Sequence, residues 1–239
     1  MRPVTDGSLS DAPSTSPARL EIGPLPRRER ERLARRRAML DAALAVFAEK
    51  GYAGATLDEV AERAEFGKGT LYNYFPGGKE EILFALIDDA YDAMVALVEA
   101  YLAETPEGTP TRVLFHGLVE RMLAHFLERH ATFRLLVKEA QRLMFDDAAA
   151  RAAHLYRLRE RVIAALTRPI EAAMDAGALR RLPAHAVAHL LIGNIHGYLM
   201  AVTCAPGGVA APVTPSPEQG ADFITEILFD GLLTDRSRP

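Results

Sequence analysis

The chain has 239 residues, enough for one large or two modest domains with a substantial core. Because 49% of the residues are hydrophobic, general disorder is excluded, and because Cys204 is the only cysteine, neither an intramolecular disulfide nor a cysteine-pair zinc site can form. The formal net charge of −4 hides a local basic excess: residues 27–37 hold seven arginines and two glutamates, a concentration that can hold a polyanion.

Residues 1–26 are expected to form a disordered, mobile tail. They contain five prolines and no apolar periodicity, so they cannot bury enough surface to offset chain entropy. The tail is either an inert extension or a segment that helps to deliver the following arginines to DNA. No apolar run follows Arg2, and the most apolar later stretch, residues 187–202, is interrupted by two histidines and an asparagine. We therefore expect no signal peptide, no membrane span and a cytoplasmic protein.

The pattern of residues 29–50 predicts a helix that Gly51 ends. Its apolar residues fall on one side, and they are Leu40, Ala43, Leu44 and Phe47. Arg35, Arg36 and Arg37 lie near its start, where they can contact backbone phosphate or a minor groove. The alternative is an ordinary solvated helix face, but the position directly before the next unit favours the DNA role.

A pair of short helices joined by a tight turn is predicted next. Thr56 is a candidate N-cap, and Glu59 three residues later completes a capping box. The apolar residues that follow at helical spacing are Leu57, Val60, Ala61 and Ala64. Gly67 interrupts this pattern, and residues 68–75 form the second helix. The buried positions of that helix are Leu71 and Phe75, four apart.

The other positions of the second helix suit contacts with phosphates and base edges. Gly69 has no side chain to obstruct a close approach. The exposed residues are Lys68, Gly69, Thr70, Tyr72 and Asn73. Periodicity alone is a moderate signal, since any two short helices separated by glycine pass the same test.

Three sequence motifs between residues 35 and 83 give a more specific signal than this periodicity. They are AxxxFAExGYxxxT at the end of the first helix, DEVAxxA in the second and KGTLYxYF in the third. With these pieces in order, about a fifth of the chain resembles the N-terminal DNA-binding domain of the TetR family of bacterial transcriptional regulators. Glu65 departs from the family's usual glycine. Gly67 stands where serine or threonine is common, so a hydroxyl cap is missing, and an extra glycine precedes Lys79.

The resemblance assigns DNA contacts to the third helix and its flanks. Tyr72 and Tyr74 lie two apart on a helix and face different ways, and the family places Tyr72 toward DNA. Thr70 and Asn73 are expected at base edges, where a good bidentate pair contributes about 1–3 kcal/mol of discrimination. The predicted phosphate contacts, which position without specifying, include Thr56, Lys68 and Lys79. The full predicted set is Arg35, Arg36, Arg37, Thr56, Lys68, Gly69, Thr70, Tyr72, Asn73, Tyr74 and Lys79.

The rest of the chain is also predicted to be helical. Residues 79–104 form a long amphipathic helix, and two prolines and a glycine at 106–110 mark a loop. Residues 111–168 lack proline and repeat helical periods, and Pro169 should kink or break the last helix before Gly177. The prediction is an all-α protein with a tail (1–26), an N-terminal three-helix helix-turn-helix DNA-binding domain (27–80) and a C-terminal helical bundle (81–239).

By the resemblance, the bundle binds a small-molecule effector of unknown identity and forms a homodimer. A pocket needs apolar and aromatic side chains with a few polar groups. The candidates are Phe115, Met122, Phe126, Phe133, Met144, Phe145 and Tyr156, although such residues at helical spacing are more often plain core.

Three histidines in residues 184–203 lie on one side of a helix. His185, His189 and His196 fall within about 40° of one another at 100° per residue. Because no carboxylate or thiol is near them in the sequence, we expect packed or interface histidines and predict no metal site and no cofactor.

The same helix and the helix at 222–233 resemble the final pair through which family members dimerise as a four-helix bundle. Gly193 and Gly197, four apart, allow close approach of another helix. The interface candidates are His189, Gly193, His196, Gly197, Ile224, Ile227 and Leu228, and residues 206–217 form the connecting loop.

We therefore expect a ligand-responsive regulator, by family a repressor, that binds double-stranded palindromic operator DNA as a dimer. Two alternatives stay open: a constitutive, nucleoid-type DNA-binding protein without an effector, and an enzyme whose head only localises it on DNA. The enzyme is disfavoured, because the sequence has no nucleophile elbow, no P-loop and no HExxH.

Overall fold

The computed structural model describes residues 26–144, 149–203 and 216–231, where it contains nine helices and no strand. The helices are α1 (Arg27–Gly54), α2 (Leu57–Arg63), α3 (Lys68–Tyr74), α4 (Gly78–Glu104), α5 (Thr111–Glu128), α6 (His130–Met144), α7 (Ala149–Asp175), α8 (Ala184–Thr203) and α9 (Pro217–Phe229). The predicted all-α class is confirmed. The predicted tail up to residue 25, Phe145 and most of the loop at 206–217 lie outside the described residues.

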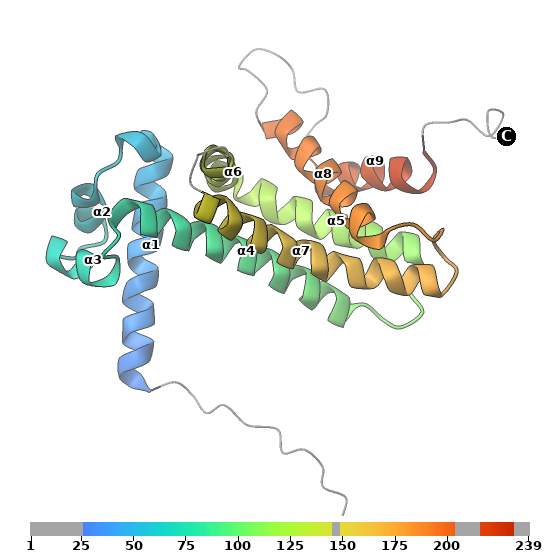
Figure 1. Cartoon of the computed structure of the whole chain (residues 1–239), viewed down its shortest axis with the longest axis horizontal. Helices are drawn as coiled ribbons and strands as arrows, with labels where there is room; N and C mark the ends of the chain where they lie inside the picture. The colour runs from blue at the N-terminus through green and yellow to red at the C-terminus, as the bar shows by residue number, and fades with distance from the viewer. Residues whose placement is uncertain (1–25, 145–148, 204–215, 232–239) are drawn as a thin grey trace, which may run out of the picture.

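Helices α1, α2 and α3 pack together at one end of the molecule and form its head (Figure 1). The predicted capping box is present: the Thr56 hydroxyl accepts a hydrogen bond from the Glu59 N–H, and the Glu59 carboxylate accepts one from the Thr56 N–H at 3.0 Å. Ion pairs of 2.5 Å, from Lys50 to Glu59 and from Arg63 to Glu49, fasten α2 to α1. The buried side chains include Met39, Leu40, Phe47, Val60, Leu71 and Phe75.

Backbone conformations with positive φ shape the connections in this region. Gly51 has φ 72° and interrupts α1 where its end was predicted, and one further turn precedes Ala55. Glu65 has φ 59°, the left-handed conformation that explains why the family usually has glycine there. The extra glycine, Gly78, has φ 69° and begins α4.

Helix α4 leads from this head into the bundle, where α7 lies beside it (Figure 1). Residues 149–175 form one helix, so Pro169 does not break it, and the predicted alternative of a kink stays a prediction. Burial of the flanking residues Leu166 and Ile170 holds the helix together across the proline, which lacks a hydrogen-bond donor. The helix ends before Gly177, whose φ of 73° agrees with the predicted stop.

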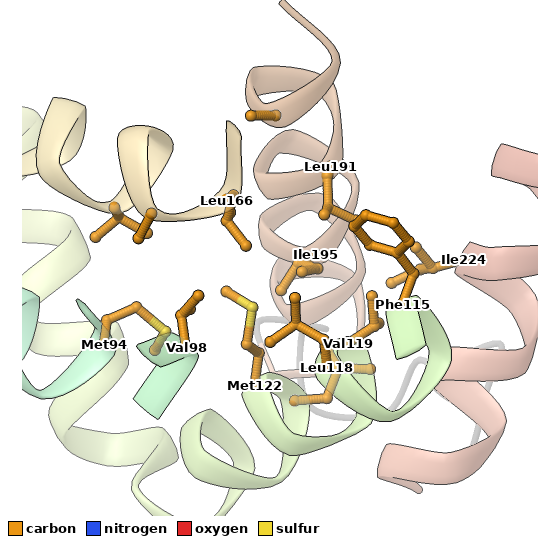
Figure 2. Close-up of a cluster of buried hydrophobic side chains, with 14 of the residues drawn as sticks. Met94, Val98, Phe115, Leu118, Val119, Met122, Leu166, Leu191, Ile195 and Ile224 are labelled. Carbon is orange, nitrogen blue, oxygen red and sulfur yellow. The ribbon is translucent and has the colours of Figure 1, made fainter. Parts of the chain in front are cut away.

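The bundle has a continuous apolar core contributed by α4, α5, α7, α8 and α9. Figure 2 shows side chains of α5, such as Met122 and Val119, facing Val98 of α4 and Ile195 of α8. Helix α9 lies against α5 at Gly220, where an added Cβ would be 2.7 Å from Leu123 Cδ1. The lack of a side chain at Gly220 therefore allows α9 to pack closely against α5.

A second apolar cluster joins the head to the bundle. It includes Phe47 and Leu71 of the head, and it continues through Leu83 of α4 to Leu143 of α6 and Leu155 of α7. These side chains form one packed core, so the head and the bundle are in direct contact through α4, α6 and α7.

One helix in the described ranges, α8, is long and apolar enough to span a membrane on length and composition alone. It packs against α5, α7 and α9 of the bundle. Apolar helices in the core of soluble proteins meet the same criteria, so this finding is weak evidence for a membrane.

Candidate nucleic-acid interface

Helix α3 is held from beneath by two buried side chains. Leu71 and Phe75 are buried in the head cluster, as their spacing predicts. Tyr72 points the other way and has 49% of its surface exposed, whereas Tyr74 is half-buried against the head cluster. The expectation that one tyrosine packs and the other reaches solvent is confirmed.

The outer face of α3 offers polar groups beside open backbone. Asn73 is exposed and Thr70 is half-buried. Gly69 is also exposed, and an added Cβ there would meet nothing within 4 Å. Gly67 is the N-cap residue and provides no side-chain hydrogen bond, as its lack of a hydroxyl predicts. The helix therefore presents a low, accessible surface with donors and acceptors for base edges.

Lysine 68 stands at the first position of α3 and forms an ion pair with Asp58 of α2. Both side chains are more than half exposed, so water screens this pair and a phosphate can replace the carboxylate. Lys68 is therefore able to move from an internal partner to DNA.

The three arginines near the start of α1 differ in their surroundings. Arg35 is exposed. The Arg36 guanidinium lies 5.4 Å from the centroid of the Phe75 ring, and Arg37 pairs with Asp41 at 2.9 Å and with Asp89 at 3.4 Å. Arg36 thus links α1 to the end of α3, and Arg37 links α1 to α4.

The Thr56–Glu59 pair is also an electrostatic centre. The hydrogen bond from Lys50, followed by those from Thr56, lowers the pKa of the Glu59 carboxyl to about 2. A hydrogen bond from Arg63 likewise lowers the pKa of Glu49. Both carboxylates stay ionised: Glu59 ties the start of α2 to α1, and Glu49 of α1 holds Arg63 at the end of α2.

The side chain of Lys79 makes contacts that its sequence did not predict. Its ammonium donates to the carbonyl oxygens of Tyr52 at 2.8 Å, Ala53 at 3.3 Å and Ala55 at 2.9 Å, at the end of α1. These bonds use all three of its donors. The phosphate contact of Lys79 stays a prediction, while the observed hydrogen bonds join the end of α1 to the start of α4.

Tyrosine 52 receives a second cation from the bundle. The Arg142 guanidinium of α6 lies 5.6 Å from the Tyr52 ring centroid, and the Lys79 ammonium lies 4.7 Å from it. Burial raises the pKa of the Tyr52 hydroxyl. No sequence pattern signals this arrangement, because the three residues come from α1, α4 and α6.

Comparison with known proteins identifies the head. The sequence profile of the bacterial regulatory proteins of the tetR family matches residues 39–86. The uncharacterized HTH-type transcriptional regulator YhgD of Bacillus subtilis is 28% identical over 146 residues, which are 61% of this chain and 72% of YhgD. The chain belongs to the TetR family.

Other relatives of this TetR-family chain are matched over different lengths. The HTH-type transcriptional repressor KstR of Mycolicibacterium smegmatis is 36% identical over 90 residues, 38% of this chain but only 40% of KstR. The crystal structure of FadR from Bacillus subtilis, in complex with stearoyl-CoA, superposes with a TM-score of 0.67 at 17% identity over 82% of this chain and 99% of FadR. At that identity the likeness shows the fold.

Four of the predicted pocket residues of this TetR-family protein lie in or against the apolar core of the bundle. Phe115 and Met122 are buried in the bundle core, and Phe126 packs on Phe133 with ring centroids 4.6 Å apart. Tyr156 of α7 is 56% exposed, and its role as a pocket residue stays a prediction. The side chain of Met144 lies outside the described residues.

A groove of about 520 Å³ lies elsewhere, between the end of α1 and α6. Leu135, Val137 and Met200 supply apolar surface, and Arg134 and Lys138 supply positive charge. None of the predicted pocket residues lines it. Its residues are far apart in sequence, so only the fold shows that they meet.

The predicted dimer residues divide into two groups. Gly193, Gly197 and Leu228 are exposed, and Ile227 is half-buried. Ile224 is already buried in the protomer core, and His196 packs on Phe133 with centroids 5.9 Å apart. The remaining candidate, His189, turns toward α7 and is described below.

The sequence reasoning missed two large exposed side chains on the same helices. Leu190 of α8 is 63% exposed, and Phe223 of α9 is 53% exposed. Leu190 precedes Gly193 and Gly197 by three and seven residues, so the three lie on one face of α8. Exposure cannot be read from hydropathy, because buried and exposed leucines have the same sequence signal.

Proposed function

We propose that this protein is a homodimeric, effector-responsive repressor of transcription that binds a palindromic operator. The observation that carries the proposal is helix α3, which is anchored by Leu71 and Phe75 and turns Tyr72 and Asn73 outward. The curated relatives are transcriptional regulators, which supports a regulator rather than an enzyme. The site of action is the cytoplasm, where the DNA is.

In this proposal α3 enters the major groove. Thr70, Tyr72 and Asn73 reach base edges, and Gly69 permits close approach of the helix backbone. Lys68 exchanges Asp58 for a phosphate, and Arg35 supplies a further phosphate contact from α1. Arg36, Arg37, Thr56, Tyr74 and Lys79 serve mainly to hold the head in shape, through the contacts described above.

The two-fold interface is proposed on the outer faces of α8 and α9. Leu190 and Phe223 are large apolar side chains exposed to solvent, which is costly unless a partner covers them. An added Cβ on Gly193 or Gly197 would meet nothing within 4 Å in the protomer, so these glycines leave room for a second chain. A dimer formed there would place two α3 helices for successive major grooves.

The effector response is proposed to pass through α6. This helix shares a core with the head through Leu136 and Leu143, and Arg142 lies over Tyr52. Residues 81–239 would then act as the effector domain and residues 27–80 as the reading head. Acyl-CoA thioesters are the first effectors to test: FadR binds stearoyl-CoA, and the groove beside α6 pairs cations with an apolar wall.

A footprint on a DNA fragment captured from the genome of origin tests the proposal. Hydroxyl-radical cleavage should show two protected patches related by an inverted repeat, one helical turn of about 34–36 Å apart or a multiple of it. An acyl-CoA should abolish the protection, and a promoter reporter should rise when the gene for the protein is deleted. Uniform protection without an inverted repeat would instead indicate a constitutive, sequence-indifferent binder, and a reporter that falls on deletion would indicate an activator.

A further inference from the structure

A carboxylate from α7 and two histidines from α8 meet at one point of the bundle. The His185 Nε2 atom lies 2.8 Å from Glu160 Oε2, and the His189 Nε2 atom lies 3.3 Å from Glu160 Oε1. One ligand atom from each of the three residues lies within 4.8 Å of the others. In the sequence the histidine stripe has no carboxylate near it, and the fold supplies the missing one from 25 residues earlier.

The carboxylate of Glu160 is incompletely satisfied. Its Oε1 atom is buried and has no partner of hydrogen-bond geometry among the described residues, although His189 Nε2 is at ion-pair distance. A buried carboxylate oxygen without a directed donor is unusual, because losing water without compensation is costly. This oxygen faces the two imidazoles, so a cation held between the three side chains would supply what the oxygen lacks.

We propose that Glu160, His185 and His189 bind a divalent transition-metal ion, with Zn²⁺ as the best match. Two imidazoles and one carboxylate with an open fourth position form a common zinc ligand set. Histidines at i and i+4 present both rings on one side of a helix. Ligands at about 2.0–2.1 Å in a tetrahedron lie about 3.3 Å apart, so the pair with His185 need widen only slightly, and His185 is exposed and able to move.

The neighbours of the cluster define what must change when the ion binds. The Arg159 Nη2 atom lies 3.4 Å from His189 Nδ1. A metal-bound imidazole carries its proton on the other ring nitrogen, so Arg159 must turn away from Nδ1. The hydrogen bond between His185 and Glu160 lowers the pKa of the Glu160 carboxyl.

The position of the site gives the ion a structural role. It would tie α7 to the first turns of α8, directly before Leu190 and Gly193 on the exposed face. This consequence rests on the proposed function: with that face as the dimer interface, the bound ion would fix the geometry of the interface. Metal binding itself is independent of DNA binding and of the dimer, so it can be tested separately.

Titration of the full, untagged, chelator-treated chain with ZnCl₂, followed by calorimetry, tests the site. The wild-type protein should bind one Zn²⁺ per chain, and Co²⁺ should give the visible absorption of a tetrahedral complex. Glu160→Gln and the pair His185→Ala with His189→Ala should each weaken Zn²⁺ by about 10-fold or more. His196→Ala, on the same face of α8 but beside Phe133, is the matched control and should leave the affinity unchanged.

A fourth variant tests the geometry itself. Arg159→Gln replaces a donor by a side chain whose carbonyl can accept from His189 Nδ1, so it should bind Zn²⁺ more tightly than the wild type. Circular dichroism of each variant verifies that it is folded. Absence of Zn²⁺ binding by the wild type, or equal binding by the folded His185→Ala, His189→Ala variant, would overturn the proposal.

Discussion

The ammonium group of Lys79 lies 2.8 Å from the carbonyl oxygen of Tyr52 and 4.7 Å from the centroid of its ring. This contact joins the end of α1 to the start of α4, where the chain passes from the head into the bundle. A lysine expected to face phosphate therefore has a part in holding the two helices together.

Replacing this lysine should lower the stability of the folded protein. Lys79→Met retains the apolar stem but leaves three carbonyl groups without their donor, so the free energy of unfolding should fall by about 1–2 kcal/mol in urea titrations. Lys68→Met, whose partner Asp58 is exposed, should leave the unfolding curve unchanged and weaken only DNA binding. Equal stability of Lys79→Met and the wild type would show that these three hydrogen bonds do not stabilise the folded protein.

Replacing Glu65 with glycine should stabilise the folded protein. Its φ of 59° costs about 1 kcal/mol for a residue with a Cβ, while glycine adopts this conformation freely. Part of that gain is offset by the greater freedom of glycine in the unfolded chain, so Glu65→Gly should stabilise by about 0.5 kcal/mol. Glu62→Gly, three residues earlier and within the helical backbone of α2, should instead destabilise by about 1 kcal/mol. Differential scanning calorimetry of both variants measures the opposite signs, and a loss of stability in Glu65→Gly would contradict the argument.

The capping carboxylate of Glu59 should make the protein sensitive to acid. Its pKa is about 2 in the folded chain and 4.5 in the reference state, so the unfolded chain binds the proton first as pH falls. The stability that Glu59 contributes is therefore present above about pH 4.5 and is lost as pH falls toward 2. Glu59→Gln cannot titrate, so the stability difference between wild type and variant should narrow from pH 7 to pH 3 in urea titrations. A difference that is constant with pH would refute the role of the charge.

Three glycines distinguish the proposed interface from the interior of the protomer. Gly193→Leu with Gly197→Leu should weaken the dimer at least about 10-fold in analytical ultracentrifugation, because side chains then fill the space left for a second chain. The folded protomer should tolerate them, since nothing lies within 4 Å of the added Cβ atoms. Gly220→Ala should do the reverse and destabilise the protomer by about 1–3 kcal/mol, because its Cβ would be 2.7 Å from Leu123 and Tyr198. Unchanged sedimentation of the double variant would place the interface elsewhere.

Much of the head could be predicted from its sequence because the signals are local. The capping box at Thr56 and Glu59, the stop at Gly51 and the division of labour between Tyr72 and Tyr74 all depend on spacings of a few residues. Glu65 shows the same principle, since the departure from glycine marks the one described non-glycine residue with positive φ.

The rest depends on contacts between distant segments, which no local pattern encodes. The three carbonyls that Lys79 meets lie 24 to 27 residues away, and Glu160 lies 25 residues from His185. Helix α7 continues through Pro169 because burial on both sides of it outweighs one missing hydrogen bond. The exposure of Tyr156 and the burial of Ile224 were not foreseen for a related reason: hydropathy does not tell which side of a helix its neighbours cover.

The most direct test of the central claim is genome-wide capture of DNA by the purified protein, freed of bound effector, at one fixed low salt concentration. The wild type and Tyr74→Phe should enrich the same few sites containing an inverted repeat, whereas Tyr72→Ala, equally folded by circular dichroism, should lose about 10-fold or more of this enrichment. If the wild type enriches no site, or if Tyr72→Ala enriches the same sites equally well, helix α3 is not the DNA-reading element.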